Sequence, residues 1–130
     1  TNPEVSSVRD SDRIIGLLDS KTVKAEKGEH MEKHLLLTRY DRARAERGDM
    51  LKVDDVLEIL SIPLLGIIPE SMDVLRASNI GSPVTLADGR SAPAMAYFDA
   101  MRRLKGEDLP VTVPGEKRGF FGKIFGRKAA

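Results

Sequence analysis

Two short runs of uninterrupted apolar residues predict the strands of this chain. One lies within residues 34–38, and the other, residues 64–68, is bounded by Pro63 and Pro69. Short runs without polar alternation are typical of strands covered on both faces, as in parallel sheets. Both runs therefore indicate strands of a parallel sheet.

Three longer segments carry apolar residues at helical spacing. The first helix is expected at 7–20, where Ser7 is the predicted N-cap and Asp10 its capping-box partner. The second is expected at 53–60 and the third at 92–105. Helices that alternate with wholly apolar strands predict an α/β fold, with a parallel sheet flanked by helices.

The third helix has the clearest boundaries. Ser91 is a good N-cap, and Gly106 suits the position just after the helix end. Met95, Phe98 and Met101 recur at a spacing that places them on one face.

The remaining segments are shorter or more charged. We expect a short helix at 73–78, a short edge strand at 83–86, and a turn at Asp88–Gly89. Charged loops are expected at 21–33 and 42–49. The predicted organisation is an α/β domain over residues 1–105, a linker over 106–116 and a separate tail over 117–130.

The tail is basic and aromatic. It holds three of the four Phe, five of the 21 Lys and Arg, and no acid. As a helix it would present one apolar stripe flanked by cations, a pattern typical of segments that lie in a membrane surface without crossing it. The residues predicted to bind the membrane are Lys117, Arg118, Phe120, Phe121, Lys123, Ile124, Phe125, Arg127 and Lys128.

The formal net charge of +1 conceals an uneven distribution, because all 20 acidic residues lie before the tail. An anionic leaflet attracts each nearby Lys or Arg by about 1 kcal/mol. One tail is expected to bind weakly and reversibly, and two tails on a dimer far more tightly. The alternative is that the Phe-rich tail docks on its own domain.

Several kinds of chemistry find no support in the sequence. There is no P-loop or dinucleotide-binding glycine motif, and the chain has no Cys, so that thiol catalysis and zinc–thiolate sites are excluded. His30 and His34 lack a third ligand and are interpreted as solvated loop residues, so no metal site is predicted. The basic residues of 39–47 alternate with acids, which does not favour nucleic-acid binding. No catalytic residue is assigned.

The turns after the two strands are more promising. In open α/β sheets, ligands bind outside the carboxyl ends of parallel strands. The segments Thr38–Tyr40 and Ile68–Ser71 occupy that edge in the predicted fold. Ordinary strand-to-helix turn chemistry is the alternative interpretation.

Six stretches of sequence and the tail carry a specific resemblance. They are Thr1–Arg13, Leu36–Tyr40, Arg47–Leu51, Val56–Leu60, Gly66–Glu70 and Val74–Asn79. Together they resemble the C-terminal half of the MinD family, the bacterial septum-site-determining ATPases of the deviant Walker A group. The resemblance implies a partial P-loop NTPase fold, with the phosphate-binding N-terminal half outside this chain.

The resemblance also implies a function. Members of the family bind ATP and Mg²⁺, dimerise around ATP, bind the cytoplasmic face of the inner membrane, recruit MinC and are released by MinE. This chain alone is expected to hydrolyse no ATP, because it has no P-loop. The implied adenine-binding residues are Thr38, Arg39, Pro69 and Glu70, and the implied surface for MinC and MinE includes Glu4, Ser6, Asp10 and Asp12. Relatives often carry an acid where this chain has Ser71.

Two other functions remain open at this point. One is a related ATPase that partitions chromosomes or places flagella. The other is a non-enzymatic membrane adaptor, in which the α/β body only presents a surface.

Overall fold

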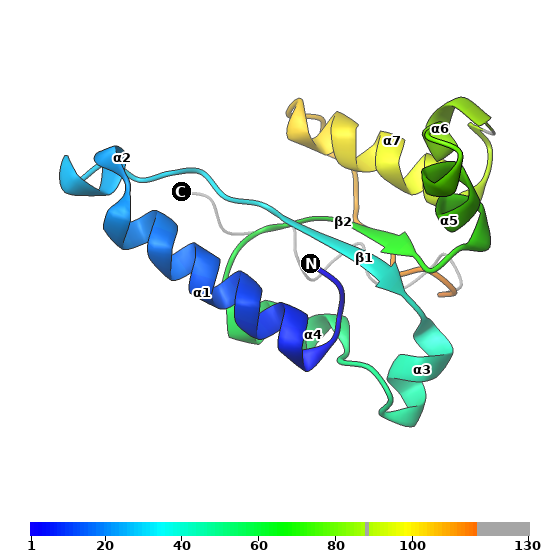
Figure 1. Ribbon diagram of the computed structural model, residues 1–130, viewed down its shortest axis with the longest axis horizontal. Coiled ribbons are helices and arrows are strands. Elements are labelled where there is room, and N and C mark those ends of the chain that lie inside the picture. Colours follow the sequence, from blue (N-terminus) through cyan, green and yellow to red (C-terminus); the bar gives the residue numbers. More distant parts are fainter. Residues whose placement is uncertain (88, 117–130) are drawn as a thin grey trace.

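The structure is a computed structural model that describes residues 1–87 and 89–116. Two strands, β1 (Leu35–Tyr40) and β2 (Leu64–Pro69), pair in parallel. They lie between α7 (Ala92–Leu104) on one face and α1 (Val5–Lys21) with α4 (Val53–Leu60) on the other (Figure 1). The predicted parallel sheet flanked by helices is confirmed.

The first residue of the chain lies beside β1. The Thr1 ammonium donates to the Leu36 carbonyl at 3.2 Å, and the Thr38 amide donates to the Thr1 carbonyl at 2.8 Å. These two bonds follow the pattern of a neighbouring parallel strand. Thr1 therefore extends the hydrogen bonding of the sheet beyond the two strands.

Helix α1 begins earlier than predicted. Its N-cap is Glu4, not Ser7, and Ser7 lies inside the helix, where its carbonyl accepts a bond of 2.8 Å from the Ser11 hydroxyl. The cause is tertiary: Pro3 is fully buried, and its carbonyl accepts from the Leu51 amide at 3.0 Å. The anchored proline sets the helix start, so the capping potential of Ser7 is not used.

The other two long helices are where the pattern predicts them. In α4, the side chains of Val53, Val56 and Leu60 are buried. Helix α7 follows Ser91, and Gly106 adopts a left-handed conformation with φ of 93° just beyond its end. Within 1–87 and 89–116, no helix is long and apolar enough to cross a membrane.

Some of the short segments differ from the prediction. The edge strand predicted at 83–86 is wrong: this segment is the helical turn α6 (Val84–Ala87), because the Leu86 and Ala87 amides both bond back to the Pro83 carbonyl. The segments expected to be charged loops contain two short helices, α2 (Val23–Glu26) and α3 (Arg42–Arg47). The predicted helix at 73–78 is confirmed as α5 (Met72–Asn79). Asp88 of the predicted turn lies outside the described residues.

Small residues bring α7 close to β2. Ala94 and Ala100 of α7 are buried, whereas Met95, Phe98 and Met101, the face noted in the sequence, are 40 to 50% exposed. A Cβ added at Gly66 of β2 would lie 3.1 Å from the Ala100 Cβ. The close approach of helix and strand therefore depends on the missing side chain at Gly66.

We expect Gly66→Ala to lower the free energy of unfolding by about 1 to 3 kcal/mol, because the added methyl group overpacks the contact between β2 and α7. The control is Gly16→Ala in α1, where an added Cβ meets nothing within 4 Å. This control should be stabilising by roughly 0.5 to 1 kcal/mol through helix propensity. Urea unfolding midpoints of both variants test the pair, and equal shifts would contradict the packing argument.

Candidate functional site

The four residues predicted at the sheet edge lie together. Tyr40 ends β1 and Pro69 ends β2, and the two are paired in the ladder. The Glu70 amide donates to the Tyr40 carbonyl at 2.9 Å. The Arg39 Nε donates to the Glu70 Oε2 at 3.1 Å. Thr38–Arg39 and Pro69–Glu70 thus form one continuous polar edge, as the parallel topology requires.

The backbone at Arg39 is unusual. Its φ is 58°, a left-handed conformation that non-glycine residues seldom adopt. The strand register shifts between Leu37 and Tyr40 at this point, so Arg39 acts as a bulge. The bulge keeps Tyr40 paired with β2 and leaves the Arg39 side chain 63% exposed above the edge. Strained backbone of this kind is frequent at ligand-binding positions.

Asn2 belongs to the same edge and was missed by the sequence reasoning. It follows Thr1, which lies beside Leu36 and Thr38 of β1. Among the described residues, the Asn2 Oδ1 is a buried side-chain oxygen without a hydrogen-bond partner. An unpaired buried oxygen is costly and calls for an explanation, such as a ligand. The only local pattern at Asn2 in the sequence is the Asn2–Pro3 pair, which favours a turn and does not indicate a binding site.

This edge offers hydrogen-bond donors and acceptors next to a planar cation. The Arg39 guanidinium is planar and can stack on an aromatic ring while it donates hydrogen bonds. Asn2 adds an amide oxygen, which can accept a bond from an exocyclic amine. Ser71 has a structural task, because its hydroxyl accepts from the Asp73 amide at 3.1 Å and caps α5. The sequence has no P-loop to bind the phosphates.

The predicted partner surface lies on and just before α1. Glu4 is half-buried at the helix start, and Ser6, Asp10 and Asp12 are exposed. Ser6 and Asp10, four residues apart, share one face of the helix. The sequence reasoning did not include Ile14 and Leu17 on this helix, although they are 56% and 51% exposed. The surface therefore combines acids with apolar side chains.

Two further predictions concern the histidines and the basic tail. His34 contacts Glu32, with Nε2 and Oε1 2.9 Å apart, and no group of three or more potential metal ligands was found among residues 1–87 and 89–116. The nine residues predicted to bind a membrane, Lys117 to Lys128, lie outside the described residues.

The fold and the edge together define the class: a parallel α/β architecture with polar turns at the carboxyl ends of its strands, where such proteins bind ligands. No family model matches the chain. It is 56% identical over 97% of its length to the septum site-determining protein MinD of Escherichia coli (strain K12), of which it covers 47%. The chain thus spans about half the length of the curated relatives it matches.

The similarity to MinD extends to solved structures. The MinD cell division protein of Aquifex aeolicus superposes with a TM-score of 0.74 at 38% identity, over 86% of this chain and 44% of that one. The MinC:MinD cell division protein complex of the same organism gives a TM-score of 0.73 at 38% identity, over 87% of this chain and 43% of that one. The resemblance to MinD is therefore confirmed.

We expect Asn2→Leu to raise the free energy of unfolding by about 1 kcal/mol, because it replaces an unpaired buried oxygen by an apolar group of similar shape. Asn79→Leu is the control, since Asn79 is exposed at the end of α5. Thermal and urea unfolding check the difference. A destabilised Asn2→Leu would show that the amide supports the fold, and would remove Asn2 from the candidate site.

Proposed function

We propose that this chain is part of a MinD-type ATPase that positions the division septum. In the complete protein, ATP-dependent dimerisation brings two copies to the membrane, where they recruit MinC until MinE causes their release. The observation that carries this proposal is the extent of the similarity, which is 56% identity over 97% of the chain and is not confined to one motif.

The chain would supply the base-binding end of the nucleotide site. Thr38, Arg39, Pro69 and Glu70 would contact the adenine, and Asn2 joins them as a further candidate. ATP and Mg²⁺ supply the phosphoryl chemistry in the complete protein, where a P-loop would hold the phosphates. Because this sequence has no such loop, the chain by itself is expected to hydrolyse no ATP.

The partner surface would lie on α1. The Aquifex aeolicus MinD was solved in a complex with MinC, which supports MinC as a partner of this protein as well. Glu4, Ser6, Asp10 and Asp12 would form the polar part of the surface that MinC and MinE share. The exposed Ile14 and Leu17 would add apolar area to it.

The tail would bind the cytoplasmic face of the inner membrane. Its cations would be attracted to anionic phospholipid, and its Phe and Ile side chains would insert at the headgroup level. Weak binding by one tail and strong binding by two would make dimerisation a membrane switch. The protein would therefore cycle between the membrane and the cytoplasm.

In the complete protein, Asp10→Ala combined with Asp12→Ala should abolish MinC and MinE binding with near-normal ATP binding. Both acids are exposed and lie beyond the first turn of α1, where surface substitutions change stability by only about 0.5 kcal/mol, so the fold should persist. Asp73→Ala is the matched control, because Asp73 is 60% exposed in the first turn of α5. Unchanged binding of both partners by the double variant would refute the surface.

Phe121→Glu combined with Ile124→Glu should abolish vesicle binding by the ATP-bound dimer and leave nucleotide binding intact. Ile80→Glu is the control, because Ile80 is 75% exposed on the body. Salt screens the Lys and Arg attraction over a Debye length of about 8 to 10 Å, so binding to vesicles with phosphatidylglycerol should weaken as salt rises. Sedimentation that ignores both the substitutions and the lipid charge would contradict membrane binding.

A further inference from the structure

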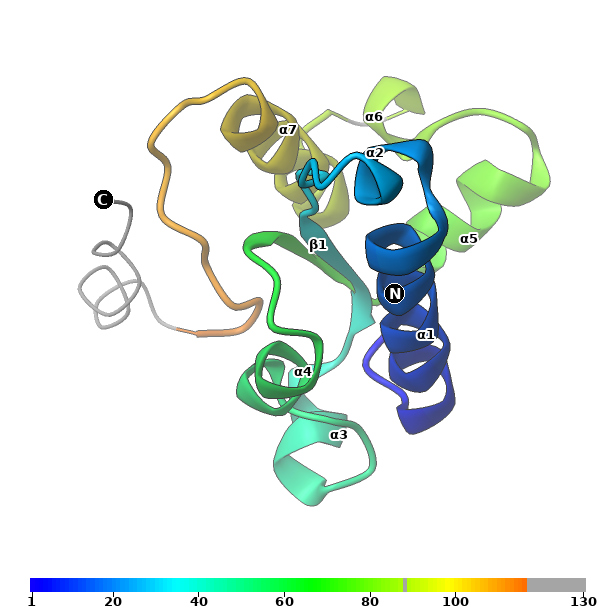
Figure 2. The ribbon, with the colours of Figure 1, turned by 90° about the vertical axis from the view of Figure 1, so that its left-hand side faces the viewer.

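The segment between α7 and the tail lies against the body of the protein. We refer to residues 107–116 as the strap. It runs down one side of the molecule, from the α7 layer toward the α4 layer (Figure 2). Val111 and Val113 of the strap pack against the hydrophobic core. The backbone of this segment is therefore placed by the fold, although its composition is that of a linker.

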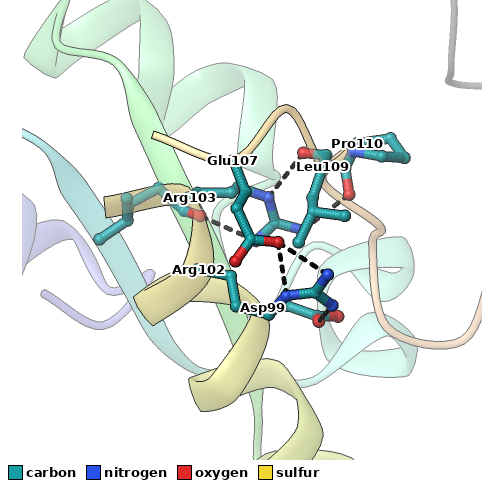
Figure 3. A network of polar contacts seen from close by, with 7 residues as sticks. Asp99, Arg102, Arg103, Glu107, Leu109 and Pro110 are labelled. Atoms are coloured by element: carbon teal, nitrogen blue, oxygen red, sulfur yellow. Dashed lines mark hydrogen bonds and ion pairs between the residues drawn. The ribbon is translucent and has the colours of Figure 1, made fainter. Parts of the chain in front are cut away.

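One side chain of α7 joins the strap to the sheet. The Arg103 Nη1 donates to the Leu65 carbonyl of β2 at 2.9 Å, while Nε and Nη2 donate to the Leu109 and Pro110 carbonyls at 2.8 and 2.6 Å (Figure 3). Burial between β2 and the strap lowers the pKa of the Arg103 guanidinium. Its planar fork can reach three acceptors at once, which a lysine ammonium does less well.

Gly66 of β2 lies beside this contact. A Cβ on Gly66 would lie 3.5 Å from the Arg103 Nη1. This is an ordinary van der Waals distance, so the tight contact at Gly66 is the one with Ala100 and not the one with the guanidinium.

A second arginine holds the far end of the strap. The Arg42 Nη1 donates to the Gly115 carbonyl at 2.7 Å. Arg42 is the second residue after β1, so Gly115 is held near the carboxyl edge of the sheet. Gly115 has φ of 83°, and an added Cβ there would lie 3.1 Å from the Arg42 Cδ. The strap is therefore anchored close to the residue where the tail begins.

We propose that Arg103, assisted by Arg42, is a positioning residue that clamps the strap, so that the tail leaves the body from a fixed point beside the candidate nucleotide edge. This inference rests on the proposed function in one respect, namely that the tail binds membranes. The clamp itself does not depend on that function.

The clamp sets the length of the free tether between body and membrane. With the strap held, few residues separate the folded body from the tail. With the strap released, each tail gains about ten flexible residues. The effective concentration of a second tail falls as the −3/2 power of tether length or more steeply, so release would lower it by roughly 5- to 10-fold. The clamp would thus strengthen binding by a dimer and leave binding by a single tail unchanged.

Arg102 offers a matched control one residue away. Its guanidinium bonds the Glu107 carboxylate at 2.7 and 2.8 Å and lies 3.8 Å from Asp99, and all three side chains are 44 to 47% exposed. Exposed ion pairs of this kind contribute little. Arg102→Met therefore removes the same type of side chain from the same helix, and the strap loses only an exposed ion pair at its first residue, Glu107.

The first test is amide hydrogen exchange in the complete protein, without lipid. Arg103→Met should accelerate exchange of the Leu109 and Glu116 amides, which donate to the Glu107 and Val113 carbonyls at 3.0 and 3.1 Å. Arg103→Lys should do so less, and Arg102→Met should not. Exchange in β1 and α4 should stay protected in all three. If Arg103→Met unfolds the body, Arg42→Met tests the other anchor. Unchanged strap exchange in folded Arg103→Met, or in Arg42→Met where that variant replaces it, would overturn the clamp.

The second test is binding to vesicles with phosphatidylglycerol. The Arg103→Met dimer formed with a non-hydrolysable ATP analogue should bind roughly 5- to 10-fold more weakly than the unchanged dimer, whereas the nucleotide-free proteins should bind alike. Equal affinity of the two dimers, or an equal loss in both states, would refute the positioning role. Absence of binding by the unchanged protein would instead refute the proposed function, and the exchange result would still decide the clamp.

Discussion

The parallel pairing of β1 with β2 is the interaction on which the rest of the molecule depends. It places the ends of both strands at one edge, and so brings together residues that are about thirty positions apart in the chain. It also presents two apolar faces, which α7 covers on one side and α1 with α4 on the other. The candidate nucleotide edge is a direct consequence of this pairing.

One irregularity in that pairing matters as much as the pairing itself. In a parallel strand, the backbone N–H and C=O groups of successive residues point to opposite edges of the strand. Without a bulge, the backbone groups of Arg39 would therefore point toward β2, and those of Tyr40 would point away from it. The left-handed conformation of Arg39 restores the contact between the Tyr40 carbonyl and the Glu70 amide. The polar edge therefore owes its shape to one strained residue.

The side of the sheet at β2 shows how packing and polar contacts combine. Gly66 allows α7 to approach, and the close helix brings Arg103 to the outer carbonyl of Leu65. The same guanidinium then holds two carbonyls of the strap. A single missing side chain in the strand thus supports both the helix layer and the route of the chain toward its basic end.

The sequence by itself determined the fold class, both strands, the three long helices and the four residues of the sheet edge. These features follow from local patterns: uninterrupted apolar runs, helical spacing, and glycine or proline at the ends of elements. It also carried the resemblance to MinD, since that rests on residue identity alone.

Tertiary structure decided the remaining features. The start of α1 depends on burial of Pro3, which outweighs the capping potential of Ser7. The position of Asn2 depends on hydrogen bonds between Thr1 and β1, and the course of the strap on three carbonyls that Arg103 reaches across 6, 7 and 38 positions. Local propensity cannot show such contacts, because they exist only once distant segments have packed together.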